Sequence, residues 1–586
     1  MLWPVCLVLS AAVLLLSIIY AAIEVNDYRS GRWMTPLKAL LLGIFLALFI
    51  ALIPIVSASL EQETAYVVKL IIYDILQAVQ VFIGEAGGDF ILENVNRTAT
   101  SISGIYSTYL SVLFIMAQVL TISVVISLFI NLLAEIKYRL RYWGDVYAFS
   151  DLNEKAVALA RSVRRNHRNA VIVFANVNKG DEDDESAYAE WAKRLRAVMF
   201  KKDLVSINLG RHRKKDLLTL IMTGENEREN LLRSLKLLED YKNRAHTNLY
   251  VCSASAEGEL LLANVDRGEV KVRRINEERA LIYQFLYDEG ETLFQTAAET
   301  PDGERRITAV IVGLGKYGME LLKALTWYCQ MDGYSLAIHA IDADEQAEEK
   351  FAARCPELAS ESDYTIKIHA GIDVETQSFA EVLRSIPDMT YLFVCLGDED
   401  DNINQSANIR TLCERMGSRP VIKTIVYNID EKKALEGITN YRNQPYGIET
   451  LGDFETLYSE EILLGSELEN LGLERHLKWG KEEEFWQYEY NYRSSVASAI
   501  HMKARKACGI PGADKREEDL SDSERAGLER LEHRRWCAYM RSEGYVYSGS
   551  RDKASRNDLA KVHPDLVDYE LLSEEDRRKD SKIGTL

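Results

Sequence analysis

The chain has 586 residues and a formal net charge of −19. That length predicts several domains, at roughly 100–200 residues per domain, and the acidic balance argues against a nucleic-acid-binding protein, because contacts with phosphates require a basic surface. The eight cysteines have no spacing typical of a zinc site or a disulfide framework, so we expect reduced cytosolic core residues and no metal site.

The N-terminal region, residues 1–136, predicts membrane-spanning helices. Three stretches are apolar and long enough to cross a hydrocarbon core of about 30 Å, at about residues 2–23, 37–56 and 106–133. We expect the first to be a retained span and not a signal peptide, since no basic segment precedes it. Lys and Arg cluster after the first and third spans, which predicts that these segments are cytoplasmic. The expected protein is a multi-pass protein of the cell inner membrane, with its N-terminus outside and its later domains in the cytoplasm.

Between the second and third spans, about residues 64–84 predict an amphipathic helix. Lys69, Tyr73, Gln77 and Gln80 share one of its faces, and apolar residues occupy the opposite one. Such a helix could lie in the membrane interface or line a pore. Polar residues also recur along the third span, where they would hold helices together or, less often, face water. No segment resembles the carbonyl filter of potassium channels, so potassium selectivity is not predicted.

A strand, a glycine loop, a helix and a second strand are predicted in succession over residues 306–342. Gly313 permits a tight turn, Gly315 lets the backbone approach a pyrophosphate, and Gly318 lets the helix pack on the strand. Asp342 ends the second strand, where a ribose hydroxyl would be bound. The motif predicts a site for NAD or another adenine nucleotide. The alternative is a Rossmann turn that serves packing alone.

A similar unit precedes this one. Residues 145–149 predict a strand, and residues 150–153 stand where the glycine loop would be. The strands predicted over 217–224 and 391–397 both end in acidic segments. These two ends are about 170 residues apart, and the two unit starts about 165 apart, which predicts an internal duplication.

This arrangement resembles the tandem RCK or TrkA-N domains that regulate the conductance of potassium channels and transporters. The resemblance covers about residues 143–475, with a first Rossmann-like domain at 143–298 and a second at 305–475. It implies nucleotide or ion binding and assembly into a homo-oligomeric ring, a tetramer being favoured, that pulls on the membrane helices. The first copy lacks the glycines, so we expect it to be a structural partner. The binding residues implied for the second copy are Gly313, Gly315, Gly318, Asp342, Asp400 and Asn402.

We do not expect an enzyme. A dehydrogenase needs an acid, a base or a Lys that a second element places over the nicotinamide, and no such constellation follows Asp342 in the sequence. His339 and His369 lie on predicted strands, where a histidine is typically a core residue. An NAD(P)-dependent oxidoreductase is the minority alternative, and no catalytic residue is predicted.

The last segment, residues 487–586, carries the most specific local motifs. A helix is predicted up to about residue 509, followed by a polar linker and a small helical domain over about 524–580. That domain contains E-H-x-x-W at 532–536, an aromatic residue, x and Tyr at 545–547, and H-P-x-L at 563–566.

These motifs resemble the RyR domain, a small helical repeat named for ryanodine receptors, although Tyr545 replaces the usual Trp and Ser548 is an additional residue. The resemblance implies a sensor of a small molecule related to adenine nucleotides. Trp536 offers a flat surface on which a base would stack, and an Arg could contact a phosphate. The alternative is that the large aromatic residues form the core of a small domain. The ligand-binding residues implied are Glu532, His533, Arg535, Trp536, Tyr547 and Arg551.

Together these features predict an α-helical transmembrane region, α/β tandem Rossmann-like domains and a small, mainly α-helical RyR domain. We expect a ligand-gated membrane channel or membrane effector that senses a nucleotide-derived small molecule and has membrane lipid as its other partner. Analogy of architecture suggests a role in nucleotide-signalled bacterial antiviral defence. The alternative is a regulatory nucleotide-binding subunit that gates a separate cation transporter.

Overall fold

The chain divides into two compact units in the computed structural model, Met1–Ile136 and Lys137–Leu586. The described residues are 2–26, 34–60, 66–84, 95, 103–141, 144–177, 182–210, 215–301, 303–360, 364–426, 428–437, 440–441, 444–445, 447–452, 454–465 and 467–577.

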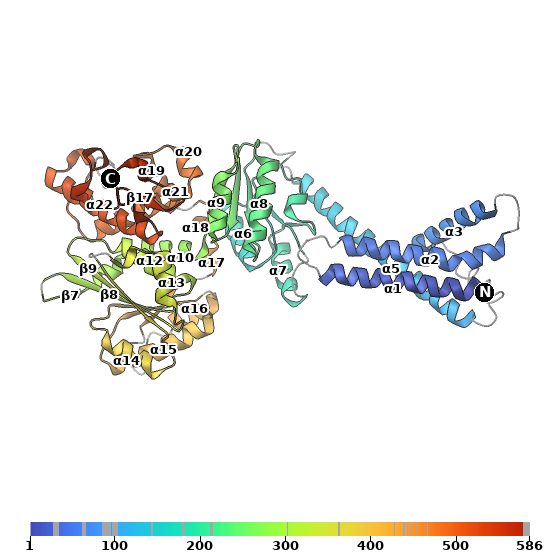
Figure 1. Cartoon of the computed structure of the whole chain (residues 1–586), viewed down its shortest axis with the longest axis horizontal. Coiled ribbons are helices and arrows are strands. Elements are labelled where there is room, and N and C mark those ends of the chain that lie inside the picture. The colour runs from blue at the N-terminus through green and yellow to red at the C-terminus, as the bar shows by residue number, and fades with distance from the viewer. Residues whose placement is uncertain are drawn as a thin grey trace. The chain divides into compact units, whose positions relative to one another are not determined.

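Four long helices make up most of the described part of the first unit, and all four are long and apolar enough to cross a membrane (Figure 1). The three predicted spans lie within α1, α2 and α5. The fourth helix, α3, forms where an amphipathic helix is predicted. Only Lys69 and Asp74 are charged within it, so α3 also meets the length and composition of a span. The bounds are α1 (Leu2–Asn26), α2 (Met34–Ser59), α3 (Tyr66–Ile83) and α5 (Ser103–Leu140).

Polar side chains inside this helical block bond to backbone carbonyl groups. The hydroxyl of Ser10 donates to the carbonyl of Ala47 at 2.6 Å, and the hydroxyl of Tyr106 donates to that of Ala51 at 2.7 Å. These bonds satisfy polar groups that would be costly to bury alone. Along α3 most apolar side chains are exposed, which suits contact with lipid; its buried residues are Asp74, Ala78 and Val81.

The second unit begins with a six-stranded parallel sheet in the order β3-β2-β1-β4-β5-β6. This is the strand order of a doubly wound Rossmann-like domain. Its core strands are four to six residues long and almost fully buried, as expected for parallel strands covered on both faces. The strands are β1 (Val146–Phe149), β2 (Val171–Phe174), β3 (Val198–Met199), β4 (Leu218–Met222), β5 (Thr247–Cys252) and β6 (Lys271–Ile275), and the helices are α6 (Glu154–Asn166), α7 (Glu182–Arg194), α8 (Glu227–Tyr241) and α9 (Ala256–Asn264).

A second sheet repeats this order as β10-β9-β8-β11-β12-β15, with the short β7 (Ala298–Glu299) antiparallel to β8. Two sheets of equivalent topology confirm the two predicted Rossmann-like folds. Helices α10 (Glu277–Asp288) and α11 (Glu291–Gln295) connect them. The strands are β8 (Arg305–Val312), β9 (Tyr334–Asp342), β10 (Tyr364–Ala370), β11 (Tyr391–Val394), β12 (Val421–Ile425) and β15 (Ile448–Leu451), and the helices are α12 (Lys316–Tyr328), α13 (Ala347–Arg354), α14 (Gln377–Ser385), α15 (Glu399–Arg415) and α16 (Ile429–Glu436).

One pair of side chains makes the duplication visible. Asn230 on α8 donates to the carbonyl groups of Gly224 and Cys252, at 2.7 and 3.1 Å, and so joins the ends of β4 and β5. Asn402 on α15 joins the ends of β11 and β12 in the second domain, by accepting from the amide of Leu396 and donating to the carbonyl of Ile425.

The helices after β15 pack on both α/β domains. Tyr539 of α22 lies in the same hydrophobic cluster as Trp327 of α12, with ring centroids 6.3 Å apart. Leu463 of α18 lies in the core of the first domain with Phe149. The C-terminal segment therefore continues the core of the second α/β domain. Its elements are α17 (Phe454–Leu457), α18 (Glu460–Leu463), α19 (Glu467–Leu477), α20 (Glu482–Gln487), α21 (Glu489–Ala507), α22 (Asp522–Ser542), β16 (Val546–Tyr547) and β17 (Val562–His563).

Candidate functional site

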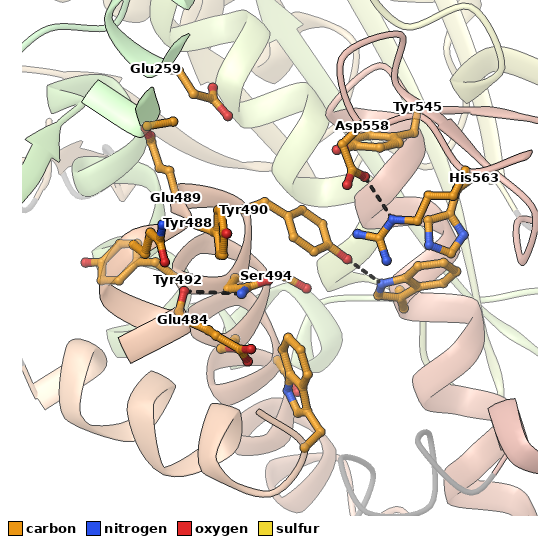
Figure 2. Close-up of a pocket in the computed structure, with 18 of the residues that line it drawn as sticks. Glu259, Glu484, Tyr488, Glu489, Tyr490, Tyr492, Ser494, Tyr545, Asp558 and His563 are labelled. Atoms are coloured by element: carbon orange, nitrogen blue, oxygen red, sulfur yellow. Dashed lines mark hydrogen bonds and ion pairs between the residues drawn. The ribbon is translucent and has the colours of Figure 1, made fainter. Parts of the chain in front are cut away.

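A cavity of about 950 Å³ lies between the first α/β domain and the C-terminal helices. One wall comes from α9 and β6, another from the segment spanning α19 to α21, and the third from α22 and the loop that leads to β17. Figure 2 shows side chains from these walls turned toward a common space. Its size falls in the range of about 300–1,000 Å³ that is typical of small-molecule sites.

The wall formed by α22 is aromatic. The ring of His533 stacks on Trp536 with centroids 5.7 Å apart, and His563 meets the same indole edge-on at 5.0 Å. The indole nitrogen of Trp536 donates to the hydroxyl of Tyr490 at 3.3 Å, which links α22 to α21 (Figure 2). Trp536 is half-buried, so part of its surface faces the cavity that it lines.

Within this wall, Glu532 lies between two guanidinium groups. It accepts from Arg535 at 2.8 Å and pairs with Arg505, and all three side chains are almost fully buried. Burial would raise the pKa of Glu532, but the charges of Arg535 and Arg505 outweigh it and lower the pKa to about 2. Glu532 is therefore an anion whose charge is already compensated within the protein.

The first α/β domain contributes a second set of side chains, which the sequence motifs did not reveal. Arg273 of β6 lies over Trp486 at 3.7 Å and Tyr492 at 4.2 Å, and its Nε atom pairs with Glu469 at 3.1 Å. A signal was present in the sequence, because Arg273 and Arg274 lie between the apolar residues Val272 and Ile275 of a short strand. Charged residues inside such a strand need partners from another element.

The six residues implied by the RyR resemblance do not all meet at this cavity. Glu532, His533, Arg535 and Trp536 line it. Tyr547 lies on β16, where its backbone amide donates to Glu357 at 3.0 Å. Arg551 is exposed and contacts the carbonyl of Leu571. Neither of these two is among the residues that line the cavity.

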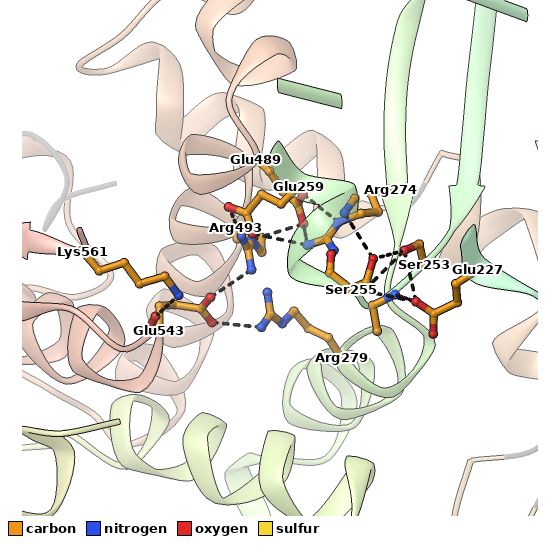
Figure 3. Close-up of polar contacts among 12 residues, drawn as sticks. Glu227, Ser253, Ser255, Glu259, Arg274, Arg279, Glu489, Arg493, Glu543 and Lys561 are labelled. Carbon is orange, nitrogen blue, oxygen red and sulfur yellow. Dashed lines mark hydrogen bonds and ion pairs between the residues drawn. The ribbon is translucent and has the colours of Figure 1, made fainter. Parts of the chain in front are cut away.

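A network of ion pairs connects the cavity to α10 and α12, and Figure 3 shows its members Glu259, Arg493, Glu543 and Arg279. Glu259, on the cavity wall, pairs with Arg493 at 2.7 Å, and Arg493 pairs with Glu543 at 2.9 Å. Arg279 of α10 then pairs with Glu543 and with Glu320 of α12, each at 3.0 Å. Burial raises the pKa of Glu543, but the neighbouring Arg and Lys charges lower it far more. Glu543 is therefore ionised.

The glycine loop of the second domain has the backbone that its motif requires. Gly313 adopts a φ of +93°, and a Cβ there would lie 2.6 Å from the carbonyl oxygen of Cys395. A Cβ on Gly318 would overlap the carbonyl of Gly313, whereas Gly315 faces open space. The loop can therefore admit a ligand at Gly315, next to the N-terminus of α12.

Asp342 and Asn402, predicted to contact a nucleotide, are engaged with the backbone. The carboxylate of Asp342 accepts from the amides of Leu314 at 2.5 Å and Asp344 at 2.8 Å. Asn402 is buried and bonds to the ends of two strands. Asp400 is exposed in the first turn of α15. Asp342 thus holds the glycine loop against β9, and a ribose would have to share its oxygens.

The corresponding crevice of the first domain is filled by polar side chains. Asn153 caps α6 by accepting from the amide of Ala156 at 2.9 Å, and it donates to the carbonyl of Thr223 at 2.7 Å. Asp151 pairs with the buried Arg233 at 3.1 Å. These contacts tie the loop at residues 150–153 to the end of β4 and to α8.

His339 and His369 lie side by side on β9 and β10, with ring nitrogens 3.2 Å apart. Burial, with the nearby His369 and Lys367, lowers the pKa of His339 to about 4, so the pair is neutral at pH 7. Among the described residues, no group of three or more His, Cys, Asp or Glu side chains could hold a metal ion.

Comparisons with known proteins add no family to this picture. No protein-family model matches the sequence, and no curated protein matches it. Any function must therefore be argued from the motifs and the geometry.

Proposed function

We propose that this protein is a ligand-gated membrane channel or membrane effector that responds to a nucleotide-derived small molecule in the cavity. The observation that carries the proposal is the cavity itself, which combines a stacking surface at Trp536 with the guanidinium groups of Arg273 and Arg535. Stacking on an aromatic ring contributes about 1–3 kcal/mol per base, and arginine suits phosphate. The resemblance to RyR and RCK domains agrees with this chemistry.

The cavity can control a conformational equilibrium because its walls belong to different elements. A ligand that contacts them all favours the arrangement in which they are closest, and it shifts the equilibrium only by its difference in affinity between states. The ion-pair network carries such a change from Glu259 to Glu320 on α12.

Helix α5 offers a route from the second unit to the membrane. Its last turn is anchored on the first α/β domain, where Tyr138 donates to the carbonyl of Leu209 at 2.6 Å and Lys137 donates to that of Ala197 at 2.9 Å. The same helix contains the apolar stretch Ser103–Ile122. A movement of the first α/β domain would therefore be transmitted to a candidate span.

In the proposed topology α3 lies in the membrane interface, and α1, α2 and α5 cross the membrane. An odd number of spans places the N-terminus outside and the second unit in the cytoplasm, in keeping with the basic clusters. We further propose a homo-oligomer, with a tetramer favoured, in the inner membrane of a bacterium, and a role in antiviral defence. Labelling of single cysteines placed at either terminus of the full chain in sealed vesicles tests the topology.

The proposal is tested by calorimetric titration of the full-length protein in detergent with NAD, ATP, ADP-ribose and cyclic nucleotides. Trp536→Ala should abolish binding if the cavity is the sensor, and Gly315→Asp should abolish it if the glycine loop is. Trp536→Phe is the matched control, because it keeps a stacking ring. Saturable binding lost in neither variant would remove both sites from the proposal.

Ligand-evoked ion flux through the purified protein in planar bilayers then tests the membrane part. Flux with the protein alone supports a channel or effector of its own. Binding without flux under any of these ligands would favour the regulatory subunit of a separate cation transporter. Steady turnover of NAD(P)H would favour the alternative function, an NAD(P)-dependent oxidoreductase.

A further inference from the structure

The cavity has two aromatic ends. Trp536 and His563 form one, and Trp486 and Tyr492 form the other, with Tyr490 between them. Figure 2 shows Tyr492 on one side, His563 on the other and Tyr490 in the middle. At about 950 Å³ the cavity is near the upper limit of ligand sites, and it offers more room than one ring and one phosphate need.

The lining residues leave hydrogen-bond donors unused. Buried groups that line the cavity and have no hydrogen-bond partner within the described part of the chain include Nη2 of Arg273, Nη1 of Arg535 and the hydroxyl of Ser495. A buried donor without an acceptor is costly. Carboxylates also line the cavity, and several of them are engaged in ion pairs: Glu489 with Arg274, Glu532 with Arg535, and Asp576 with Lys553.

We propose that the cavity takes one anionic ligand with two planar rings joined by a phosphate-bearing linker, the dinucleotide class, which bridges α22 and the first α/β domain. One ring stacks at the Trp536 end, and the other packs at the opposite end, beside the contacts that Arg273 makes with Trp486 and Tyr492. The linker oxygens accept from Arg273, Ser495 and Arg535 after a small rotation of these side chains. This inference rests on the proposed function of the cavity.

A ligand that bridges the two walls would account for the fixed position of the Arg273 side chain. Its guanidinium group lies over the rings of Trp486 and Tyr492 and is fixed by its ion pair with Glu469. A cation fixed in this way loses little freedom when it binds a phosphate. Arg273 belongs to the first α/β domain and Arg535 to α22, so a linker that contacts both ties the two parts together.

The test compares NAD, which has two rings and a diphosphate, with AMP, which has one ring and one phosphate. Titrations use the full-length protein in detergent and its Arg273→Gln and Ser495→Ala variants. Because a hydrogen bond to a charged group is lost, Arg273→Gln should weaken NAD binding by about 10–100-fold and leave AMP binding at the Trp536 end unchanged. Ser495→Ala, which removes only a hydroxyl, should weaken NAD binding less. Lys271→Gln is the matched control, since Lys271 lies on the same strand over Trp486 but outside the cavity lining.

Hydrogen exchange gives an independent readout of bridging. NAD should protect both β6 and α22, whereas AMP should protect α22 alone. Three outcomes would each overturn the proposal that one ligand bridges both ends of the cavity. They are binding of AMP without binding of NAD, equal NAD affinity in Arg273→Gln and the wild type, and protection of α22 alone by NAD. Failure of both compounds to bind the wild type would instead overturn the proposed function of the cavity, and this inference with it.

Discussion

At the scale of single residues, the candidate side chains differ in what their polar atoms already contact. Glu532, Asp342 and Asn402 have partners inside the protein. Their first role is to hold neighbouring groups in place. Arg273 and Arg535 each retain one nitrogen without a hydrogen-bond partner among the described residues, so they are the stronger candidates for direct ligand contact.

Buried carboxylates of this kind make stability depend on pH. The pKa of Glu532 and that of Glu320 are each lowered to about 2 from an ordinary value of 4.5, by the arginine and lysine charges that outweigh burial. When folding lowers the pKa of a carboxyl group, the ionised group stabilises the folded state fully at pH values above its ordinary pKa. This stabilisation is lost as the pH falls toward the lowered pKa of the folded state. We therefore expect the free energy of unfolding of the full chain in detergent to fall between about pH 4.5 and pH 2.

Urea unfolding at a series of pH values measures this effect. Glu532→Gln should lower the stability at pH 7 and flatten the decline on acidification, since one of the titrating groups is gone. Glu570→Gln, which alters an exposed pair with Arg530, should leave the profile unchanged. An equally steep decline in Glu532→Gln would show that Glu532 is not one of the groups responsible.

Two glycines of the same loop give a matched pair of variants. Gly318→Ala forces a Cβ onto the carbonyl of Gly313, whereas Gly315→Ala meets no atom within 4 Å at a φ of −62°. We expect Gly318→Ala to cost about 1–3 kcal/mol of stability, as overpacking does, and Gly315→Ala to change it by less than about 0.5 kcal/mol. Thermal unfolding measures both. Equal stability of the two variants would contradict the close packing of α12 on β8.

At the scale of elements, α22 connects the parts of the second unit. Its aromatic residues line the cavity, Tyr539 packs on Trp327 of α12, and Glu543 at its C-terminal end pairs with Arg279 and Arg493. Helix α12 in turn starts at the glycine loop. The cavity and the glycine loop are therefore connected through the packed pair α12 and α22, which provides a physical path for coupling between them.

Removal of the carboxylate of Glu543 tests this junction. Glu543→Ala leaves two buried guanidinium groups with one partner fewer, so we expect a loss of about 3 kcal/mol in stability, near the lower end for a broken buried pair. The loss should be accompanied by weaker binding in the cavity, because Arg493 also orients Glu259. Chemical unfolding and calorimetric titration measure the two effects. Wild-type stability in this variant would mean that the ion pairs are not coupled to the packing of α22 on α12.

At the scale of the whole molecule, the two units have separate physical characters. Four apolar helices belong to the first unit, and the two parallel sheets belong to the second. A fragment that starts at Lys137 keeps the last turn of α5, which is bonded to the first α/β domain.

We expect this fragment to fold, to remain in the supernatant after high-speed centrifugation and to retain the cavity. The full chain should sediment with membranes. Circular dichroism and sedimentation measure the outcome. A fragment that aggregates without a cooperative transition would show that the second unit depends on the first.

The sequence was sufficient for the elements whose local pattern is strong. Apolar runs predicted three helices within α1, α2 and α5, and the glycine loop and acidic strand ends predicted two Rossmann-like domains. These patterns follow from chain-local rules, namely apolar length, period and turn chemistry. The sequence predicted an amphipathic helix at α3, and the structure has a helix there whose 18 residues also meet the length and composition of a span.

The tertiary structure alone decided the site. Arg273 meets Trp486 and Tyr492 only because β6 of the first domain faces the segment from α20 to α21, more than 200 residues later in the chain. It also decided that Asp342 and Asn402 bond to backbone groups and that Tyr547 and Arg551 lie outside the cavity lining. Motifs report which residues are present, whereas partners and burial depend on contacts between distant segments, and those contacts determine which polar groups remain for a ligand.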